Sequence, residues 1–149
     1  MDYKAVFITV GAHQGLRLGI EGEESPGVVD GATFLREVNL GLKPPIGERV
    51  AVVGGGNVAI DAARTTLRLG AREVKVLYRR SREEMPAELS EVEQTIEEGV
   101  EILFLVTPTK IERIDGQLGL ICTCMELGQP DASGRRRPVP IKGSEFLMD

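Results

Sequence analysis

The sequence has few of the residues from which disulfide frameworks and metal sites are built. Its 149 residues include two cysteines, Cys122 and Cys124, and a single histidine, His13. Two cysteines this close together cannot staple a small secreted fold, and their C-x-C spacing differs from the C-x-x-C of a redox turn. One histidine excludes a multi-histidine metal site within the chain. We therefore expect packing roles for both cysteines and no metal ligand.

The chain also lacks long apolar runs and an excess of basic charge. No stretch approaches the roughly 18 apolar residues that a membrane-spanning helix needs. Residues 1–4 lead straight into a strand-like run and predict no secretory signal. With 18 Lys+Arg against 23 Asp+Glu, the formal net charge is −5, which disfavours a general nucleic-acid binder. We expect a cytoplasmic protein with no membrane or nucleic-acid partner.

The first third of the chain predicts little regular structure. Residues 3–10 are β-branched and aromatic, which indicates a buried strand, and Gly11 ends it. Residues 11–31 are rich in glycine and predict a loop, while residues 32–40 predict a short helix. Two prolines in residues 41–47 disfavour a helix and indicate a connector. We therefore expect a boundary at residue 47.

A strand–helix repeat begins at Glu48. Its expected strands and amphipathic helices cover residues 49–53, 57–69, 74–78, 86–98 and 100–106. Strands that alternate with helices predict a parallel sheet with right-handed crossovers. Gly70 suits the end of the first helix, and Pro86 suits the first turn of the second.

The last third of the chain predicts antiparallel strands. Residues 109–114 and 118–127 form a hairpin pattern around the turn Asp115-Gly116. A polar, turn-rich loop is expected over residues 128–137. Residues 139–147 could then supply a third antiparallel strand, which completes a β-meander.

The turn after the first strand of the repeat carries a dinucleotide-binding motif. It reads G-x-G-x-x-A, with Gly54, Gly56 and Ala59 at the three positions. Gly54 permits a tight turn, the missing side chain at Gly56 lets a pyrophosphate approach the backbone, and Ala59 allows close helix packing. The first helical amides then face the anion, and Asn57 is the candidate N-cap. The alternative is a glycine turn that serves packing alone.

The end of the second strand indicates which dinucleotide binds. NAD sites carry an acid there, whereas this strand ends in Arg79 and Arg80. Guanidinium groups match phosphate geometry, which favours the 2′-phosphate of NADP(H). The alternative is a solvated surface loop. Residues 83–101 are rich in glutamate and predict a solvated helix face. The glutamates near Arg79 and Arg80 could also hold these arginines in place when the site is empty.

Two segments resemble a known family. VGGGNVAIDAAR at residues 53–64 and YRRSREEMPA at residues 78–87 resemble the NADPH-binding domain of glutamate synthase small (β) subunits. That group includes the flavoprotein half of dihydropyrimidine dehydrogenase and, more distantly, adrenodoxin-reductase-like enzymes. The Y-R-R-x-x-x-x-M-P-A segment is more specific than the glycines, and the match extends over nearly the whole chain. Motif and resemblance together predict an α/β, Rossmann-like, FAD/NAD(P)-binding domain of three layers: a parallel sheet, crossover helices and an antiparallel β-meander.

The resemblance implies a flavoprotein that passes a hydride from NADPH to FAD. Electrons would then travel through iron–sulfur clusters to a large glutamate synthase subunit, for glutamate synthesis from glutamine and 2-oxoglutarate, or to another electron-accepting subunit. It implies that glycine-turn amides hold the pyrophosphate, that the paired arginines hold the 2′-phosphate, and that Glu91 approaches the nicotinamide. The candidate cofactor-binding residues are Gly54, Gly55, Gly56, Asn57, Val58, Asp61, Arg79, Arg80 and Glu91. No catalytic residue is assigned.

The sequence also departs from the family pattern. It has no N-terminal glycine fingerprint for FAD and no iron–sulfur cysteines, and the family's last strand of this domain would follow Asp149. We therefore expect residues 1–47 to be the end of an FAD-domain strand with a loop, short helix and connector. Residues 48–149 would be an NADP(H)-binding domain without its last strand. Such a fragment would bind neither FAD nor iron–sulfur clusters and would be inactive alone.

Two other functions stay open at this point. One is a non-catalytic module that senses NADP(H) or docks a partner. The other is an S-adenosylmethionine enzyme, because such enzymes also use glycine-rich strand–helix turns. The paired arginines argue against the second alternative, since that ligand has no 2′-phosphate.

Overall fold

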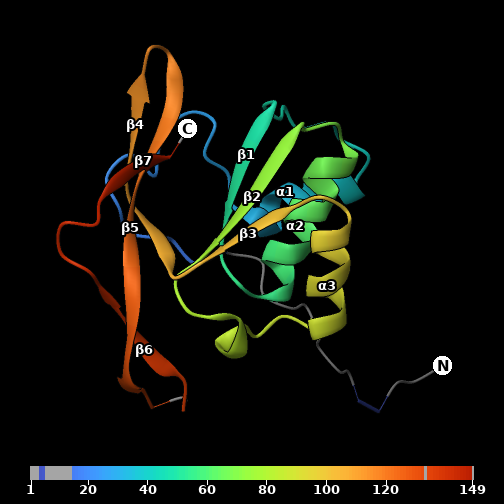
Figure 1. Ribbon diagram of the computed structural model, residues 1–149. Coiled ribbons are helices and arrows are strands. Elements are labelled where there is room, and N and C mark those ends of the chain that lie inside the picture. Colours follow the sequence, from blue (N-terminus) through green and yellow to red (C-terminus); the bar gives the residue numbers. More distant parts are fainter. Residues whose placement is uncertain (1–3, 6–14, 133, 149) are drawn as a thin grey trace.

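The computed structural model describes residues 4–5, 15–132 and 134–148. His13 and most of the strand expected over residues 3–10 lie outside these residues. The elements are α1 (Gly31–Asn39), β1 (Arg49–Val53), α2 (Asn57–Arg68), β2 (Glu73–Tyr78), the 3₁₀ helix η1 (Arg82–Glu84), α3 (Leu89–Glu97), β3 (Glu101–Phe104), β4 (Val106–Ile114), β5 (Gln117–Pro130), β6 (Arg136–Pro140) and β7 (Phe146–Met148). They stack in three layers, as Figure 1 shows, with the parallel strands between the helices and the antiparallel strands. The predicted fold class is confirmed.

The middle layer is a parallel sheet in the order β1–β2–β3. Its register places Val53 of β1 opposite Leu77 of β2, so both strands end at the same edge. Helices α2 and α3 cover one face, where Ile60 of α2 and Val92 of α3 belong to one buried cluster. A second cluster joins Ala63 of α2 to the sheet. Alternating strands and helices thus give the crossovers that the sequence predicts.

The antiparallel layer covers the other face of the sheet. Strands β4 and β5 meet at a two-residue turn in which Asp115 and Gly116 both have positive φ, 51° and 83°. This is the backbone twist that two-residue hairpins prefer. Leu77 of the parallel sheet packs against Cys122 of β5, which is fully buried. Burial raises the pKa of the Cys122 thiol to about 11, which agrees with a packing role.

Several expected boundaries are wrong. The third parallel strand ends at Phe104 instead of residue 106, because Leu105 takes a φ of 57° and redirects the chain into β4. The loop expected over residues 128–137 is shorter, since β5 runs to Pro130 and β6 begins at Arg136. The single third strand is two short strands, β6 and β7, both paired with β5. Between them, the hydroxyl of Ser144 accepts the backbone N–H of Cys124 at 3.0 Å and replaces the missing ladder bond.

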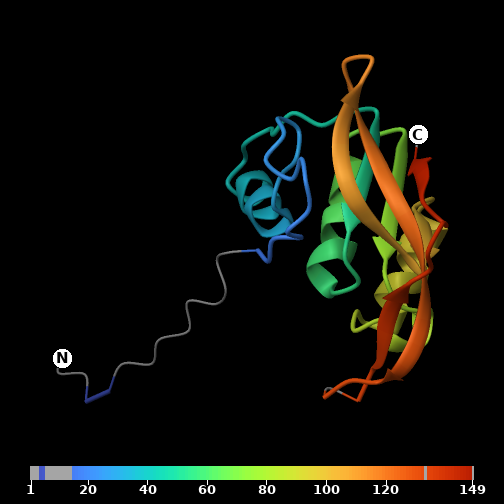
Figure 2. The same ribbon diagram turned by 90° about the vertical axis from the view of Figure 1, so that its left-hand side faces the viewer.

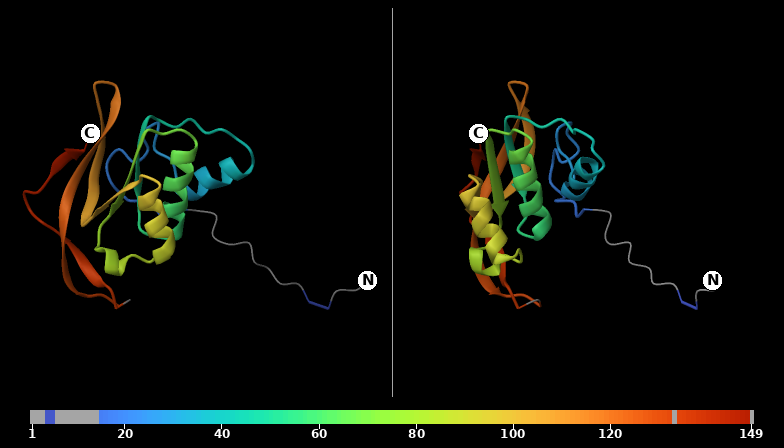
Figure 3. Two further views of the ribbon diagram at one scale, coloured as in Figure 1. Left: turned by 45° about the vertical axis from the view of Figure 1, so that its right-hand side comes forward. Right: turned by 90° about the vertical axis from the view of Figure 1, so that its right-hand side faces the viewer.

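Helix α1 and the loop before it pack on the rest of the domain. Asp30 caps α1 by accepting the N–H of Ala32 at 2.8 Å. Figures 2 and 3 show α1 and the preceding loop beside α2, on the side away from α3. The loop also reaches β4, where the N–H of Ile111 donates to the carbonyl of Glu21 at 2.8 Å. Across the described ranges, the structure holds no helix with the length and apolar character to cross a bilayer.

Candidate dinucleotide-binding site

The turn from β1 into α2 needs glycine at its first position. Gly54 has a φ of 145°, a conformation that L side chains rarely adopt. A Cβ atom there would also lie 3.2 Å from the Cβ of Ala59. The N–H of Gly54 donates to the carbonyl of Leu77 at 3.0 Å and closes the end of the β1–β2 ladder. Gly54 and Ala59 thus bring the helix close to the strand, as the motif requires.

Gly55 is constrained by Tyr78 at the end of β2. A Cβ atom at position 55 would lie 2.4 Å from Cδ2 and Cε2 of the Tyr78 ring. The ring is held in turn by its hydroxyl, which donates to the carbonyl of Glu84 at 2.7 Å. The carbonyl of Gly55 accepts the N–H of Ala87 at 3.1 Å. Gly55 therefore ties the glycine turn to the segment that follows β2, a role that sequence reasoning missed.

Gly56 has no packing reason to be glycine. Its φ of −93° and ψ of 173° suit any residue, and no atom of the residues that the structure describes lies within 4 Å of a Cβ built there. The N–H groups of Ala59 and Ile60 donate to its carbonyl. The N–H groups of Asn57 and Val58, at the start of α2, have no hydrogen-bond partner within the described residues. Open space beside unpaired helical N–H groups is what an incoming pyrophosphate needs.

Asn57 is not the N-cap, which corrects the sequence expectation. Gly56 occupies the cap position and Asn57 is the first helical residue. The Asn57 side chain instead accepts the backbone N–H of Glu88 at 3.1 Å. Because the N–H groups of Ala87 and Glu88 are engaged by the glycine turn, α3 begins only at Leu89, three residues after Pro86. The proline therefore precedes the helix and is not in its first turn.

The helical period of the sequence predicts Leu89, Val92 and Ile96 on one apolar face of the second helix, and this prediction is only partly correct. Val92 is buried, but Leu89 and Ile96 are 58% and 44% exposed. Thr95 is fully buried instead, and its hydroxyl donates to the carbonyl of Glu91 at 2.6 Å. That internal bond satisfies the buried hydroxyl, so a polar residue fills a position that periodicity would give to an apolar one.

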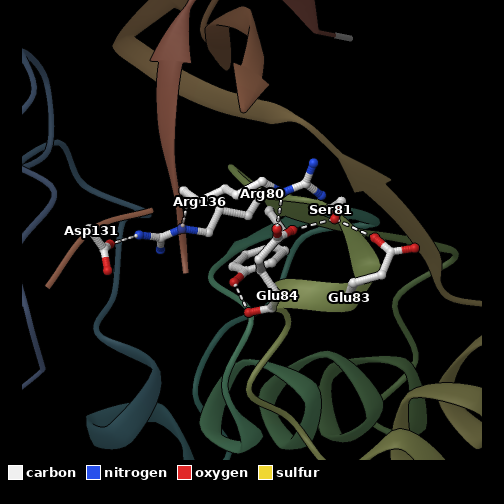
Figure 4. A network of polar contacts seen from close by, with 7 residues as sticks. Arg80, Ser81, Glu83, Glu84, Asp131 and Arg136 are labelled. Atoms are coloured by element: carbon white, nitrogen blue, oxygen red, sulfur yellow. Dashed lines mark hydrogen bonds and ion pairs between the residues drawn. The ribbon is translucent and has the colours of Figure 1, made fainter. Parts of the chain in front are cut away.

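The two arginines after β2 lie in different surroundings. Arg79 is exposed and makes no hydrogen bond or ion pair with any described residue. Arg80 is 5% exposed. Its Nε donates to the carbonyl of Arg136 at 2.8 Å, and its Nη2 pairs with the carboxylate of Asp131 at 2.7 Å. Figure 4 shows this network, in which the Arg136 side chain reaches back to Glu84.

Arg79 stands out among the cations of residues 64–82. The other six pair with acids, through the contacts Arg64–Glu98, Arg68–Glu98, Arg72–Glu48, Lys75–Glu73, Arg80–Asp131 and Arg82–Glu93. Within the described part of the chain, Arg79 alone in this zone has no acidic partner. A free guanidinium at the end of the strand that follows the glycine turn is suited to bind an anionic ligand.

Asp61 and Glu91 lie on the helical side of the site, near Arg64. The hydrogen bonds that Arg64 donates to Glu98 raise the pKa of Arg64 most, and the charges of Glu91 and Asp61 raise it further. Arg64 and Arg68 in turn lower the pKa of Glu98 from 4.5 to about 2, chiefly through the Arg64 hydrogen bond. This cluster joins α2 to the end of α3. It leaves the glycine turn and Arg79 as the open part of the candidate site.

Comparisons with known proteins agree with this geometry. The profile of the pyridine nucleotide-disulphide oxidoreductase family matches residues 1–130. The NADP(+)-dependent formate dehydrogenase subunit beta of Moorella thermoacetica is 52% identical over 99% of this chain and 21% of its own length. The NADPH-Fe(3+) oxidoreductase subunit beta of Geobacter sulfurreducens is 48% identical, over 99% and 23%. The glutamate synthase [NADPH] small chain of Escherichia coli is 40% identical, over 99% and 34%. The resemblance inferred from the sequence is thereby confirmed.

A solved structure shows the same fold. FprA from Mycobacterium tuberculosis in complex with NADPH superposes with a TM-score of 0.74 at 20% identity. That match covers 93% of this chain and 46% of the other. The chain spans between a fifth and about a third of the length of the three curated relatives.

Proposed function

Because the chain belongs to the pyridine nucleotide-disulphide oxidoreductase family, we propose that it is the NADP(H)-binding part of an NADPH-dependent flavoprotein oxidoreductase. The observation that carries the proposal is Gly56. No contact with a described residue requires glycine there, and the space that a side chain would fill lies beside the unpaired N–H groups of Asn57 and Val58. A ligand that approaches the backbone gives a reason for the missing side chain.

In the proposed binding mode, two positively charged features of the site each bind a different phosphate group of the dinucleotide. The amides of Gly55, Gly56, Asn57 and Val58 and the start of α2 would bind the pyrophosphate. Arg79 would bind the 2′-phosphate and so select NADP(H) over NAD(H). When bound, NADPH supplies the hydride.

The helical side of the site is proposed to face the other end of the cofactor. Glu91 is proposed to approach the nicotinamide, with Asp61 as a polar neighbour. Both acids act on the pKa of Arg64, which supports a shared location on this side. Their carboxyl groups would favour ligand groups that donate hydrogen bonds and would disfavour a second phosphate there.

The parent protein is proposed to carry the rest of the chemistry. An FAD domain would accept the hydride, and iron–sulfur clusters would pass electrons to a partner subunit in the cytoplasm. Glutamate synthesis is the specific activity that the sequence motifs favour. The formate dehydrogenase and Fe(3+) oxidoreductase relatives are at least as similar to this chain, so the common proposal is a module through which NADPH exchanges electrons with a larger assembly.

Calorimetric titration of the chain with NADPH and NADH at matched salt tests the proposal. We expect tighter binding of NADPH, with an affinity that falls steeply as salt increases. Arg79→Ala should reduce NADPH affinity by about tenfold or more and leave NADH affinity unchanged. Arg72→Ala is the matched control, since Arg72 is also an exposed arginine but pairs with Glu48 away from the glycine turn. Equal losses for both nucleotides, or no binding by the folded wild-type chain, would refute the proposal.

A further inference from the structure

Two arginine side chains cross between the end of β2 and the β5–β6 hairpin in opposite directions. Arg80 extends from the end of β2 to Asp131 on the hairpin, whereas Arg136 extends from the hairpin back to Glu84, just beyond β2. Figure 4 shows the two side chains side by side and pointing in opposite directions. The bond from Arg80 Nε to the Arg136 carbonyl, at 2.8 Å, fixes one against the other. The guanidinium group that lies beside Glu84 is therefore that of Arg136, whereas the guanidinium group of Arg80 lies beside Asp131.

Arg80 is poorly placed to bind an external phosphate. Its side chain is 6% exposed, and both the Nε and Nη2 donors are used within the protein. Turning it outward would leave the Asp131 carboxylate and the Arg136 carbonyl without these donors, which is costly for partly buried groups. Its contacts instead hold the hairpin against the end of β2.

Arg136 has the properties that Arg80 lacks. Its side chain is 49% exposed, and only its Nε is bound, to Glu84 Oε1 at 2.6 Å. Its two terminal nitrogens point away from Glu84 in Figure 4 and make no hydrogen bond with a described residue. Glu84 is itself anchored, because its second oxygen accepts the hydroxyl of Ser81 and its side chain is 9% exposed. The fork of Arg136 is thus held in one orientation with free donors outward.

We propose that Arg136 is the second arginine of the 2′-phosphate site and acts with Arg79, while Arg80 serves the hairpin. This inference rests on the proposed function. It assigns nucleotide specificity to a residue of the antiparallel layer, more than fifty positions after the glycine turn. The Ser81 hydroxyl above all, and then Arg136, lower the pKa of Glu84, so its carboxylate is charged at neutral pH and balances the guanidinium before ligand binds.

The test compares Arg136→Ala with Arg137→Ala, an exposed neighbour on the same strand. The probes are 2′,5′-ADP and 5′-ADP, which separate the 2′-phosphate from the rest of the nucleotide, together with NADPH and NADH. We expect Arg136→Ala to weaken 2′,5′-ADP and NADPH by about tenfold or more and to leave 5′-ADP and NADH unchanged. Arg137→Ala should bind all four probes as the wild type does.

The controls separate this inference from the proposed function. If the wild type prefers NADPH and Arg136→Ala retains that preference in full, Arg136 is not a phosphate ligand and the proposed function stands. If the folded wild type binds neither nucleotide, both ideas fail. Arg136→Lys keeps the charge without the fork, so it covers the case in which the alanine variant does not fold. We expect its preference for 2′,5′-ADP to be intermediate, and a wild-type preference would contradict the inference.

Discussion

The ring of Tyr78 occupies the space that a side chain at position 55 would need, since a Cβ atom on Gly55 would lie 2.4 Å from two of its ring carbons. Gly55, the middle glycine of the motif, therefore allows the glycine turn to pack closely against the end of β2. A Cβ atom on its neighbour Gly56 would meet no atom of a described residue within 4 Å. The two adjacent glycines thus differ: Gly55 has a packing role, and for Gly56 we propose a role in ligand approach.

Gly55→Ala should destabilise the fold. The ring of Tyr78 is buried and held by the hydroxyl bond to Glu84, so it cannot move aside freely. We expect the free energy of unfolding to fall by about 1–3 kcal/mol, as for other overpacked sites. Urea denaturation measures this directly. A variant with wild-type stability would show that Tyr78 rotates away and that the contact is unimportant.

Gly56→Ala should separate binding from stability. The backbone at Gly56 suits alanine, and the added methyl group would meet no atom in the described part of the chain. Alanine is a poorer N-cap than glycine, which lowers stability, but it also reduces the conformational freedom of the unfolded chain, which raises stability. Because the two effects oppose each other, stability should change by less than about 1 kcal/mol. NADPH affinity should fall by about tenfold or more, because the methyl group blocks the pyrophosphate. Titration and denaturation of the same sample check both halves, and unchanged affinity would contradict the binding mode.

Arg80→Ala should lower stability more than Arg79→Ala does. Removing Arg80 takes away one donor from the Arg136 carbonyl and one from the Asp131 carboxylate, at a cost of roughly 1–3 kcal/mol. Arg79 is exposed and has no partner among the described residues, so its removal should change stability by less than about 0.5 kcal/mol. Thermal unfolding of the two variants compares them. Equal stability losses would show that the Arg80 contacts contribute nothing to the fold.

The Glu98 carboxylate should make stability depend on acidic pH. Arg64, above all, lowers its pKa in the folded protein from 4.5 to about 2. A depressed folded pKa stabilises the protein above the unfolded value, and that contribution is lost as pH falls from 4.5 toward 2. Glu98→Gln should therefore have a lower Tm than the wild type at pH 7, and the difference should shrink over that window. Glu97→Gln, an exposed neighbour, is the control, and a difference that stays constant with pH would refute the assignment.

Local patterns predicted the elements that depend on local signals. The strand periodicity around Val52 and Val76 and the helical period around Ile60 report burial directly, so the parallel sheet and its crossovers could be read from the sequence. The Asp115-Gly116 turn was equally visible, because positive φ at both positions favours these residue types.

Long-range contacts explain what the sequence could not show. Asparagine is a residue type that favours N-caps, but the Asn57 side chain accepts the N–H of Glu88 instead. Glu88 follows β2 in the chain and lies beside Asn57 only in the folded structure. Arg80 resembles a free phosphate ligand until Asp131, 51 residues away, is placed beside it. Arg136, which we propose as a phosphate ligand, lies in a run of three arginines in which nothing local distinguishes one from the next. In each case tertiary pairing decides the role of a polar side chain.

The most direct test of the account is an amide chemical-shift titration of the chain with NADPH and with NADH. We predict that both nucleotides shift the signals of Gly56, Asn57 and Val58, and that NADPH alone shifts those around Arg79. A well-dispersed spectrum in which these amides stay unmoved by NADPH, or in which the shifts gather elsewhere, would contradict the dinucleotide site.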